Sequence, residues 1–261
     1  MRIRLEMVIQ TMLAVVALNA VFAQSSSAAF IYLAAKNLSP GHILEINGVV
    51  EDSIYARPAN NLTSFTSGPK LGTPGTAANP STMIYYCNAI NEKRIYCLGD
   101  GVIYTHRTYV REVAFGPGPA LYFSESSGAT ADGKIYRLNA AMVPVLYYTV
   151  RLGQVGGFWA GHFAFSPAGR LFISSGNIVR ARIWACPLGP AAPVPMYRDR
   201  GPILGFCVTD AAARTFYFTN GTPQLRRGIF GGPPPAVVFV SPKRNNYCDV
   251  LVSDIQITPN G

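Results

Sequence analysis

Charged residues and helix signals are scarce in this sequence. Asp, Glu, Lys and Arg together make up only 13% of the 261 residues, and helix signals are nearly absent after residue 35. Apolar residues reach 49% without long runs beyond the N-terminus, and the chain has 25 Gly and 20 Pro. Such a composition suits many short strands joined by tight turns. We therefore expect an all-β chain.

Several catalytic motifs are missing as well. The sequence has no nucleophile elbow, no phosphate-binding loop and no Cys-x-x-Cys pair. Only three His residues occur, and we expect His42 and His106 to lie in loops or outer strands without a functional role. Ser-His-Asp catalysis and phosphate binding by a loop therefore have no support in the sequence.

Residues 1–23 are typical of a secretory signal peptide. A basic start is followed by the mostly apolar stretch Met7–Ala23, which ends in residues that signal peptidase accepts. Polar residues such as Gln10 and Asn19 interrupt this stretch, which disfavours its alternative role as a retained membrane anchor. We predict a secreted, extracellular protein whose residues 24–261 form a single domain.

A sequence motif of about a dozen residues recurs along the chain. Its copies are Val113–Glu125, Phe163–Gly176, Phe206–Asn220 and the fragment Val250–Asp254. The anchor residues Phe115, Phe165, Val208 and Val252 are 50, 43 and 44 residues apart, and we expect all four to be buried. A period of about 40–50 residues with several strands in each copy predicts a β-propeller of five or six four-stranded blades.

The ends of the chain supply complementary pieces of one blade. The N-terminal strands lack an inner strand, whereas residues 249–252 have no complete blade of their own. We predict that this C-terminal strand completes the N-terminal blade and closes the ring, which removes exposed sheet edges. The stretch Asn60–Ser81 is either a long loop or a degenerate strand of a sixth blade.

The repeats resemble those of secreted NHL-type propellers and of the gluconolactonase and strictosidine-synthase-like group. The resemblance is carried by Lys134-Ile-Tyr-Arg-Leu138, Ala181-Arg-Ile-Trp184 and Gly169-Arg-Leu-Phe-Ile-Ser-Ser175. It covers about residues 82–254. It is strong for repeat architecture and weak for any one family, and fold alone does not decide function.

Aligned inner strands place one column of residues at the start of each strand. The column contains Glu112, His162, Gly205 and Asp249, and its side chains are expected to face the central channel. The resemblance to lactonase-like propellers implies that Glu112, His162 and Asp249 could hold a Ca²⁺ ion there. The alternative is a set of polar side chains solvated by a wet channel, with no cofactor.

The five cysteines of an exported chain predict disulfides. Cys87 and Cys97 flank a turn-rich segment, so we predict a disulfide that closes this hairpin. The pairing of Cys186, Cys207 and Cys248 stays open.

Two N-glycosylation acceptors are also present. These are Asn61, in Asn61-Leu-Thr63, and Asn220, in Asn220-Gly-Thr222. Both assignments depend on export to a compartment that glycosylates.

The chain carries a formal net charge of +9. With export implied, nucleic acid is a poor partner, and acidic or sulfated glycans or anionic lipid surfaces are better ones. A generally basic surface without such a partner is the alternative.

Two functions follow from these features. We favour a non-catalytic extracellular protein that binds a glycan, a peptide or copies of itself. The alternative is a Ca²⁺-dependent hydrolase or lactonase of small esters that uses a metal in the central channel.

Overall fold

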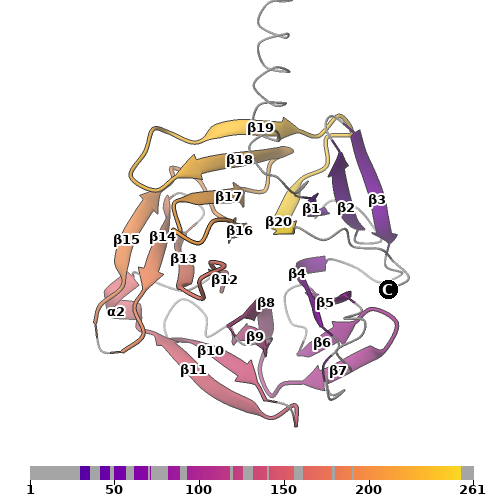
Figure 1. The fold of residues 1–261 in the computed structure, drawn as a ribbon, viewed down its shortest axis with the longest axis vertical. Coiled ribbons are helices and arrows are strands. Elements are labelled where there is room, and N and C mark those ends of the chain that lie inside the picture. The colour runs from indigo at the N-terminus through magenta and orange to yellow at the C-terminus, as the bar shows by residue number, and fades with distance from the viewer. Residues whose placement is uncertain are drawn as a thin grey trace, which may run out of the picture.

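Five small antiparallel sheets surround a central axis in the computed structural model of the chain (Figure 1). The protein is a five-bladed β-propeller with four strands in each blade. The structure describes residues 30–35, 42–47, 50–56, 62–69, 71, 82–88, 93–117, 120–125, 132–139, 141–155, 161–177, 180–189 and 191–253.

In each blade the four strands follow one another from the central axis outward, and they are named in that order. Blade 1 contains β20 (Tyr247–Ser253), β1 (Phe30–Ala35), β2 (His42–Asn47) and β3 (Val50–Ala56). Blade 2 contains β4 (Leu62–Pro69), β5 (Thr82–Asn88), β6 (Arg94–Cys97) and β7 (Gly101–Thr105). Blade 3 contains β8 (Val110–Gly116), β9 (Ala120–Glu125), β10 (Gly133–Leu138) and β11 (Pro144–Val150), and α2 (Leu152–Val155) follows it. Blade 4 contains β12 (Phe163–Phe165), β13 (Leu171–Asn177), β14 (Arg180–Cys186) and β15 (Val194–Arg198). Blade 5 contains β16 (Gly205–Val208), β17 (Thr215–Thr219), β18 (Gln224–Ile229) and β19 (Ala236–Val240).

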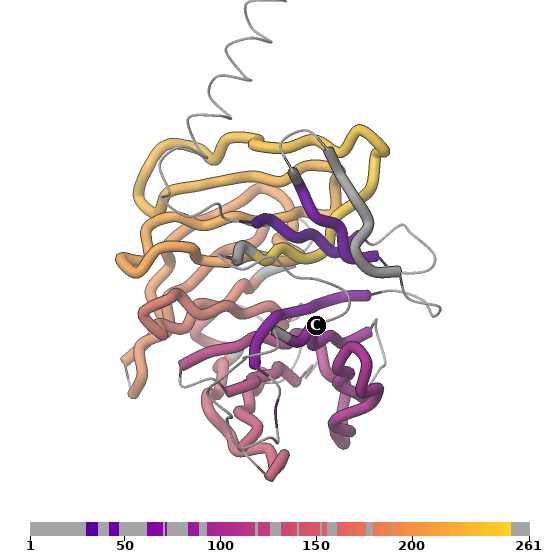
Figure 2. Tube along the Cα trace, turned by 45° about the vertical axis from the view of Figure 1, so that its right-hand side comes forward, coloured from indigo at the N-terminus to yellow at the C-terminus, as the bar shows by residue number. Residues whose placement is uncertain are grey.

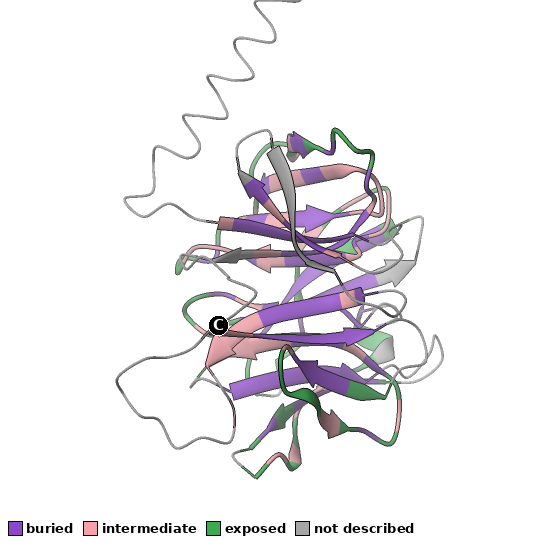
Figure 3. Ribbon diagram, turned by 90° about the vertical axis from the view of Figure 1, so that its right-hand side faces the viewer, coloured by how far each residue is buried: buried purple, intermediate pink, exposed green. Residues whose placement is uncertain are grey.

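The core lies between the blades. Each of five apolar clusters combines side chains of two adjacent blades, and together the clusters cover all five junctions of the ring. Successive strand residues point to opposite faces of their sheet. In β1, Tyr32 and Ala34 therefore pack toward blade 2, whereas Leu33 and its alternate neighbours pack toward blade 5. Burial of both faces explains why most strands nearer the axis lack a wet side, whereas the outermost strands β7, β11, β15 and β19 keep exposed residues (Figure 3).

The C-terminal strand closes the ring as predicted. β20 is antiparallel to β1, with Ile31 opposite Val252 and Leu33 opposite Val250. Figure 2 shows this contact between the two ends of the described chain, where yellow meets indigo. The N-terminal blade thus takes its inner strand from the C-terminal part of the sequence.

The uncertain stretch Asn60–Ser81 contains an inner strand. Residues Leu62–Pro69 form β4, which pairs along its length with β5 and completes blade 2. The alternatives of an entire loop or a sixth blade are therefore wrong. The strand was hard to recognise because its sequence, Leu-Thr-Ser-Phe-Thr-Ser-Gly-Pro, is mostly polar or small.

The repeat anchors are buried less uniformly than expected. Val208 is buried, whereas Phe115 and Phe165 are only half-buried, and the side chain of Val252 lies outside the described residues. A methyl group at Gly68 would lie 2.4 Å from the Phe115 ring, and one at Gly116 would lie 2.7 Å from the Phe165 ring. Each ring thus packs on a glycine of the preceding inner strand, and part of it stays accessible.

Antiparallel strands place the loops alternately on two faces of the disc. Face A is defined as the face at which inner strands begin, and it carries the loops between second and third strands and the connections between blades. Face B carries the loops between first and second and between third and fourth strands. The strand pairings of the blades establish this alternation.

The predicted signal peptide over residues 1–23 lies outside the described residues. Within the part of the chain that the structure describes, no helix is long and apolar enough to cross a membrane.

Loss of β20 should destabilise the ring. A chain that ends at Asn246 loses the buried side chains of Tyr247 and Val250 and leaves β1 without its inner partner. We expect a loss of about 5 kcal/mol or more in the free energy of unfolding, since each buried side chain of this size contributes about 2–5 kcal/mol. Thermal unfolding, with a chain ending at Ser253 as control, tests this. A truncated monomer that melts like the control would contradict ring closure as the source of stability.

Candidate functional site

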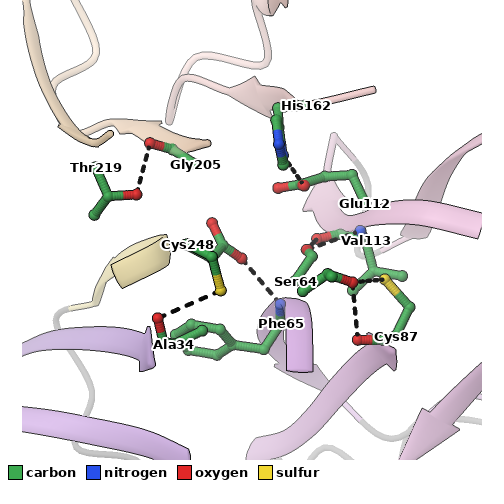
Figure 4. Close-up of polar contacts among 12 residues, drawn as sticks. Ala34, Ser64, Phe65, Cys87, Glu112, Val113, His162, Gly205, Thr219 and Cys248 are labelled. Carbon is green, nitrogen blue, oxygen red and sulfur yellow. Dashed lines mark hydrogen bonds and ion pairs between the residues drawn. The ribbon is translucent and has the colours of Figure 1, made fainter. Parts of the chain in front are cut away.

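The predicted column of inner-strand residues forms a polar ring around the axis (Figure 4). Glu112 and Asp249 are each the third residue of their inner strand, His162 directly precedes β12, and Gly205 begins β16. Blade 2 contributes Ser64, the third residue of β4, which the sequence analysis missed because β4 was not recognised. The described members of this ring are buried rather than solvated, and none of its polar residues is more than 7% exposed.

Three of the inner strands have a register shift at this position. The shift falls between Leu62 and Ser64 in β4, between Val110 and Glu112 in β8, and beside Asp249 in β20. A β-bulge of this kind re-aims the next side chain. The bulges explain how a residue at a strand start can be turned toward the neighbouring blade.

Glu112 and His162 form the shortest polar contact of the ring. Glu112 Oε2 lies 2.6 Å from His162 Nδ1, and both side chains are buried. Burial raises the pKa of Glu112 well above its usual range, although a hydrogen bond with Ser64 opposes this shift. Burial also lowers the pKa of His162 to about 4. Both shifts favour an uncharged pair, in which Glu112 and His162 share one hydrogen bond.

Asp249 is held by backbone groups on both sides. Its Oδ2 accepts the N–H of Phe65 at 3.0 Å, and its Oδ1 accepts the N–H of Val250 at 2.8 Å. Burial, with the nearby Glu112, raises the pKa of Asp249 well above its usual range. The carboxyl group thus joins blade 1 to blade 2 and is committed to the backbone.

Ser64 and Gly205 serve two further junctions. Ser64 Oγ accepts the N–H of Val113 at 3.1 Å, which joins blade 2 to blade 3. A methyl group at Gly205 would lie 2.4 Å from the Asp249 Cα, so glycine is needed for β16 to approach β20. With Glu112–His162 between blades 3 and 4, the ring residues connect the inner strands of neighbouring blades.

The ring does not fit a metal ion. No group of three His, Cys, Asp or Glu side chains in the described part of the chain is placed to hold one. The Glu112 carboxyl is bonded to His162, and the Asp249 carboxyl to Phe65 and Val250. The three predicted Ca²⁺ ligands therefore share a ring but do not converge on a common point as ligands. The prediction of solvated channel side chains is also wrong, because all three are buried.

A second buried polar cluster lies between blades 2 and 3. His106 Nδ1 is 2.9 Å from Tyr104 Oη, and its Nε2 is 3.5 Å from Glu125 Oε2, which also accepts the Tyr136 hydroxyl at 2.7 Å. Burial lowers the pKa of His106. Burial alone would raise the pKa of Glu125. Hydrogen bonds with Tyr136, Thr108 and His106 have the larger effect, so the pKa of this carboxyl is lowered. The expectation that His106 lies in a loop or outer strand without a role missed this cluster, whose members meet only through packing.

The predicted Cys87–Cys97 disulfide is wrong. Neither cysteine is in a disulfide, and both are buried. The predicted hairpin exists, but its register places Cys87 opposite Ile95 and Cys97 opposite Tyr85. Diagonal positions of this kind lie about 7–8 Å apart, beyond the usual Cα separation of a disulfide. Burial raises the pKa of the Cys87 thiol, which makes it a poor nucleophile.

The predicted glycosylation acceptors are located differently. Asn61 lies outside the described residues. Asn220 lies after β17, is half-buried, and accepts a hydrogen bond from Thr222 Oγ1 at 2.6 Å. Glycosylation of both stays a prediction.

No protein-family model matches the chain, and no curated protein matches it either. Among solved structures, it is similar to a chain in the crystal structure of a nidogen/laminin complex, with 11% identity over 86% of this chain and 98% of that chain and a TM-score of 0.54. It also matches an oxidoreductase (glucose dehydrogenase) from Thermus thermophilus, with 16% identity over 88% and 81% of the two chains and a TM-score of 0.47. A gluconolactonase structure matches with 9% identity over 88% and 92% and a TM-score of 0.45. The nidogen/laminin similarity supports the β-propeller fold alone, and the other two carry no argument about function.

Substitution of Gly205 should test the close contact in the ring. In Gly205→Ala, the new methyl group would collide with the backbone of β20. We expect a loss of about 1–3 kcal/mol in the free energy of unfolding, as for other overpacked sites. Chemical denaturation measures the effect. Gly201→Ala is the matched control, because nothing lies within 4 Å of a methyl group there. Equal stability of the two variants would contradict the contact.

The protonation of Glu112 gives a second test. Because its pKa is raised in the folded protein, the stability that the protonated acid provides is lost as pH rises through that pKa. Gln cannot ionise, so the melting temperature of Glu112→Gln relative to the parent should rise between about pH 5 and about pH 8. Glu125→Gln is the control of opposite sign, since the pKa of Glu125 is lowered and its carboxylate stabilises the fold at both pH values. A pH-independent difference for Glu112→Gln would show that Glu112 is ionised throughout.

Proposed function

We propose that this chain is a secreted, non-catalytic propeller that binds a glycan, a peptide or a second copy of itself. The observation that carries the proposal is the state of the axial ring. Its ionisable side chains, Glu112, His162 and Asp249, are buried and bonded to neighbouring strands. A substrate could reach these groups only by breaking the contacts that they make with neighbouring strands. The ring is therefore a structural device, and function is left to the surface.

Exposed aliphatic side chains on face B support a binding role. Val102, Val145, Val194 and Val237 are each the first or second residue of the outermost strand of a blade, and their exposures are 47%, 52%, 52% and 45%. Large apolar side chains that are exposed at equivalent positions indicate contact with a partner more than scattered surface residues do. A protein partner or a second copy of the chain would cover these valines.

Export is supported by the sequence of residues 1–23, which has the charge and apolar pattern of a signal peptide. The half-buried Asn220 remains a candidate for glycosylation in such a compartment. A propeller of this fold occurs in a nidogen/laminin complex, an assembly of proteins. At 11% identity this similarity is compatible with protein binding without identifying a partner.

The hydrolase alternative needs a metal or another activating group at the axis. The donor groups of the ring are engaged with each other and with backbone N–H groups, as described above. No arrangement among the described residues favours this alternative.

Metal binding, ligand binding and self-association of the secreted protein together test the proposal. Calorimetry with Ca²⁺ should show no binding, and a chelator should leave the melting temperature unchanged. A glycan and peptide array, with analytical ultracentrifugation, should detect a ligand or reversible self-association. If face B makes the contact with a peptide or a second copy, Val145→Ser combined with Val194→Ser should weaken that association. Ca²⁺-dependent ester or lactone hydrolysis that is lost in Glu112→Ala would overturn the proposal.

A further inference from the structure

The positive charge of the described chain is concentrated on face A. The described lysine and arginine residues within two positions of a strand end at face A, or in its loops, are Lys93, Arg94, Arg107, Arg111, Lys134, Arg151, Arg180, Arg182, Arg198, Arg200, Arg226, Lys243 and Arg244. The remaining described cations, Arg137, Arg170, Arg214 and Arg227, lie nearer face B.

Few acidic groups compensate this charge. The described acidic residues at face A that are not buried are Asp132 and Asp199. Glu112, Glu125 and Asp249 are buried, and burial raises the pKa of Glu112 and Asp249, which favours their neutral forms. The asymmetry between the two faces therefore makes face A a positively charged surface that attracts anions over a distance.

Four arginines occupy the face A end of the two outer strands of blade 4, at the left of Figure 1. Arg182 of β14 and Arg198 of β15 are directly opposite in the antiparallel pair. Like charges at opposite positions destabilise a sheet. Hydrogen bonds of Ala181 with Asp199 and Gly201 extend the pairing beyond the end of β15, so that Arg180 and Arg200 lie beside the first pair. All four arginines are exposed.

One acidic residue, Asp199, lies within this cluster. Asp199 Oδ1 accepts the backbone N–H of Arg200 at 2.6 Å and of Gly201 at 3.4 Å. Its Oδ2 has no hydrogen-bond partner among the described residues. The described part of the cluster thus holds four arginines and one acidic residue, and a bound anion would reduce the repulsion of the directly opposed pair Arg182 and Arg198.

Two further arginines at face A have donors without acceptors. The Nε atoms of Arg111 and Arg226 are buried, and no hydrogen-bond partner lies among the described residues. A buried donor without a partner is costly, so such groups are commonly completed by a ligand or water. Guanidinium groups bind sulfate and carboxylate groups through paired N–H donors.

We infer that face A binds an acidic polysaccharide through its sulfate or carboxylate groups, with Arg180, Arg182, Arg198 and Arg200 as the main contact. This inference deepens the proposed binding function and rests on it. A polymer suits the surface better than a small anion, because the cations extend over blades 2 to 5.

The distribution of apolar side chains favours a glycan over a lipid bilayer. A membrane-binding surface combines cations with aliphatic or aromatic side chains that insert between lipids. Most of the exposed large apolar side chains lie near face B, whereas Tyr109 and Val240 are those at face A. Cations and apolar residues thus occupy different faces, and face A is suited to a polar, anionic partner.

Heparin binding by the full secreted protein tests this inference, with affinity and salt dependence measured by biolayer interferometry. Arg198→Gln combined with Arg200→Gln should weaken heparin binding about tenfold or more, since one hydrogen bond to a charged group contributes about 1.5–3 kcal/mol. The matched control is Arg137→Gln combined with Arg214→Gln, which removes the same charge near face B and should leave affinity unchanged. Polygalacturonate, which carries only carboxylates, should compete with heparin, and neutral dextran should not.

Four results would overturn the inference. These are an equal loss of affinity in the two double variants, equal binding of dextran, stronger binding to phosphatidylserine vesicles, and stronger binding to DNA. If heparin does not bind but the array or ultracentrifugation still detects a ligand or self-association, the inference fails and the proposed binding function stands. If heparin binds and Ca²⁺-dependent hydrolysis is also found, the inference about face A stands and the proposed non-catalytic function fails.

Discussion

Burial of both faces of every blade is the constraint on which this structure depends. An isolated four-stranded antiparallel sheet cannot bury two apolar faces, so each blade needs a neighbouring blade on either side. The five clusters between adjacent blades meet this need only when the ring is complete. The pairing of β20 with β1 is therefore more than a link between the ends of the domain. It supplies the last missing partner for blades 5 and 1.

Close approach of the inner strands explains the chemistry of the axial ring. Near the axis, Gly205 allows β16 to approach the backbone of β20, whereas Gly68 and Gly116 leave room for the rings of Phe115 and Phe165. Polar groups in this space must bond to each other or to backbone groups, because they are shielded from water. Glu112, His162 and Asp249 do so in forms that minimise buried charge. A ring that resembles a ligand set in sequence thus functions as a set of contacts between blades.

Separation of properties between the two faces follows from the strand order. Each antiparallel meander sends its loops alternately to face A and face B, so equivalent positions of different blades share a face. Repeated residues therefore accumulate there: arginines on face A and exposed valines on face B. The buried axis and the differentiated surfaces are the features from which the binding role is proposed.

Three features of the sequence were sufficient to predict the propeller, its ring closure and the ring positions of Glu112, His162 and Asp249. They are the repeat period, the residue pattern that recurs in the blades, and the complementary ends of the chain. These features are local or periodic, so they are visible in the sequence. The polar strand β4, the state of the ring and the His106 cluster were decided by tertiary structure, because they depend on contacts between blades. The same holds for the cysteines: the sequence determined that Cys87 and Cys97 flank a hairpin, but only the strand register decided that they do not face each other.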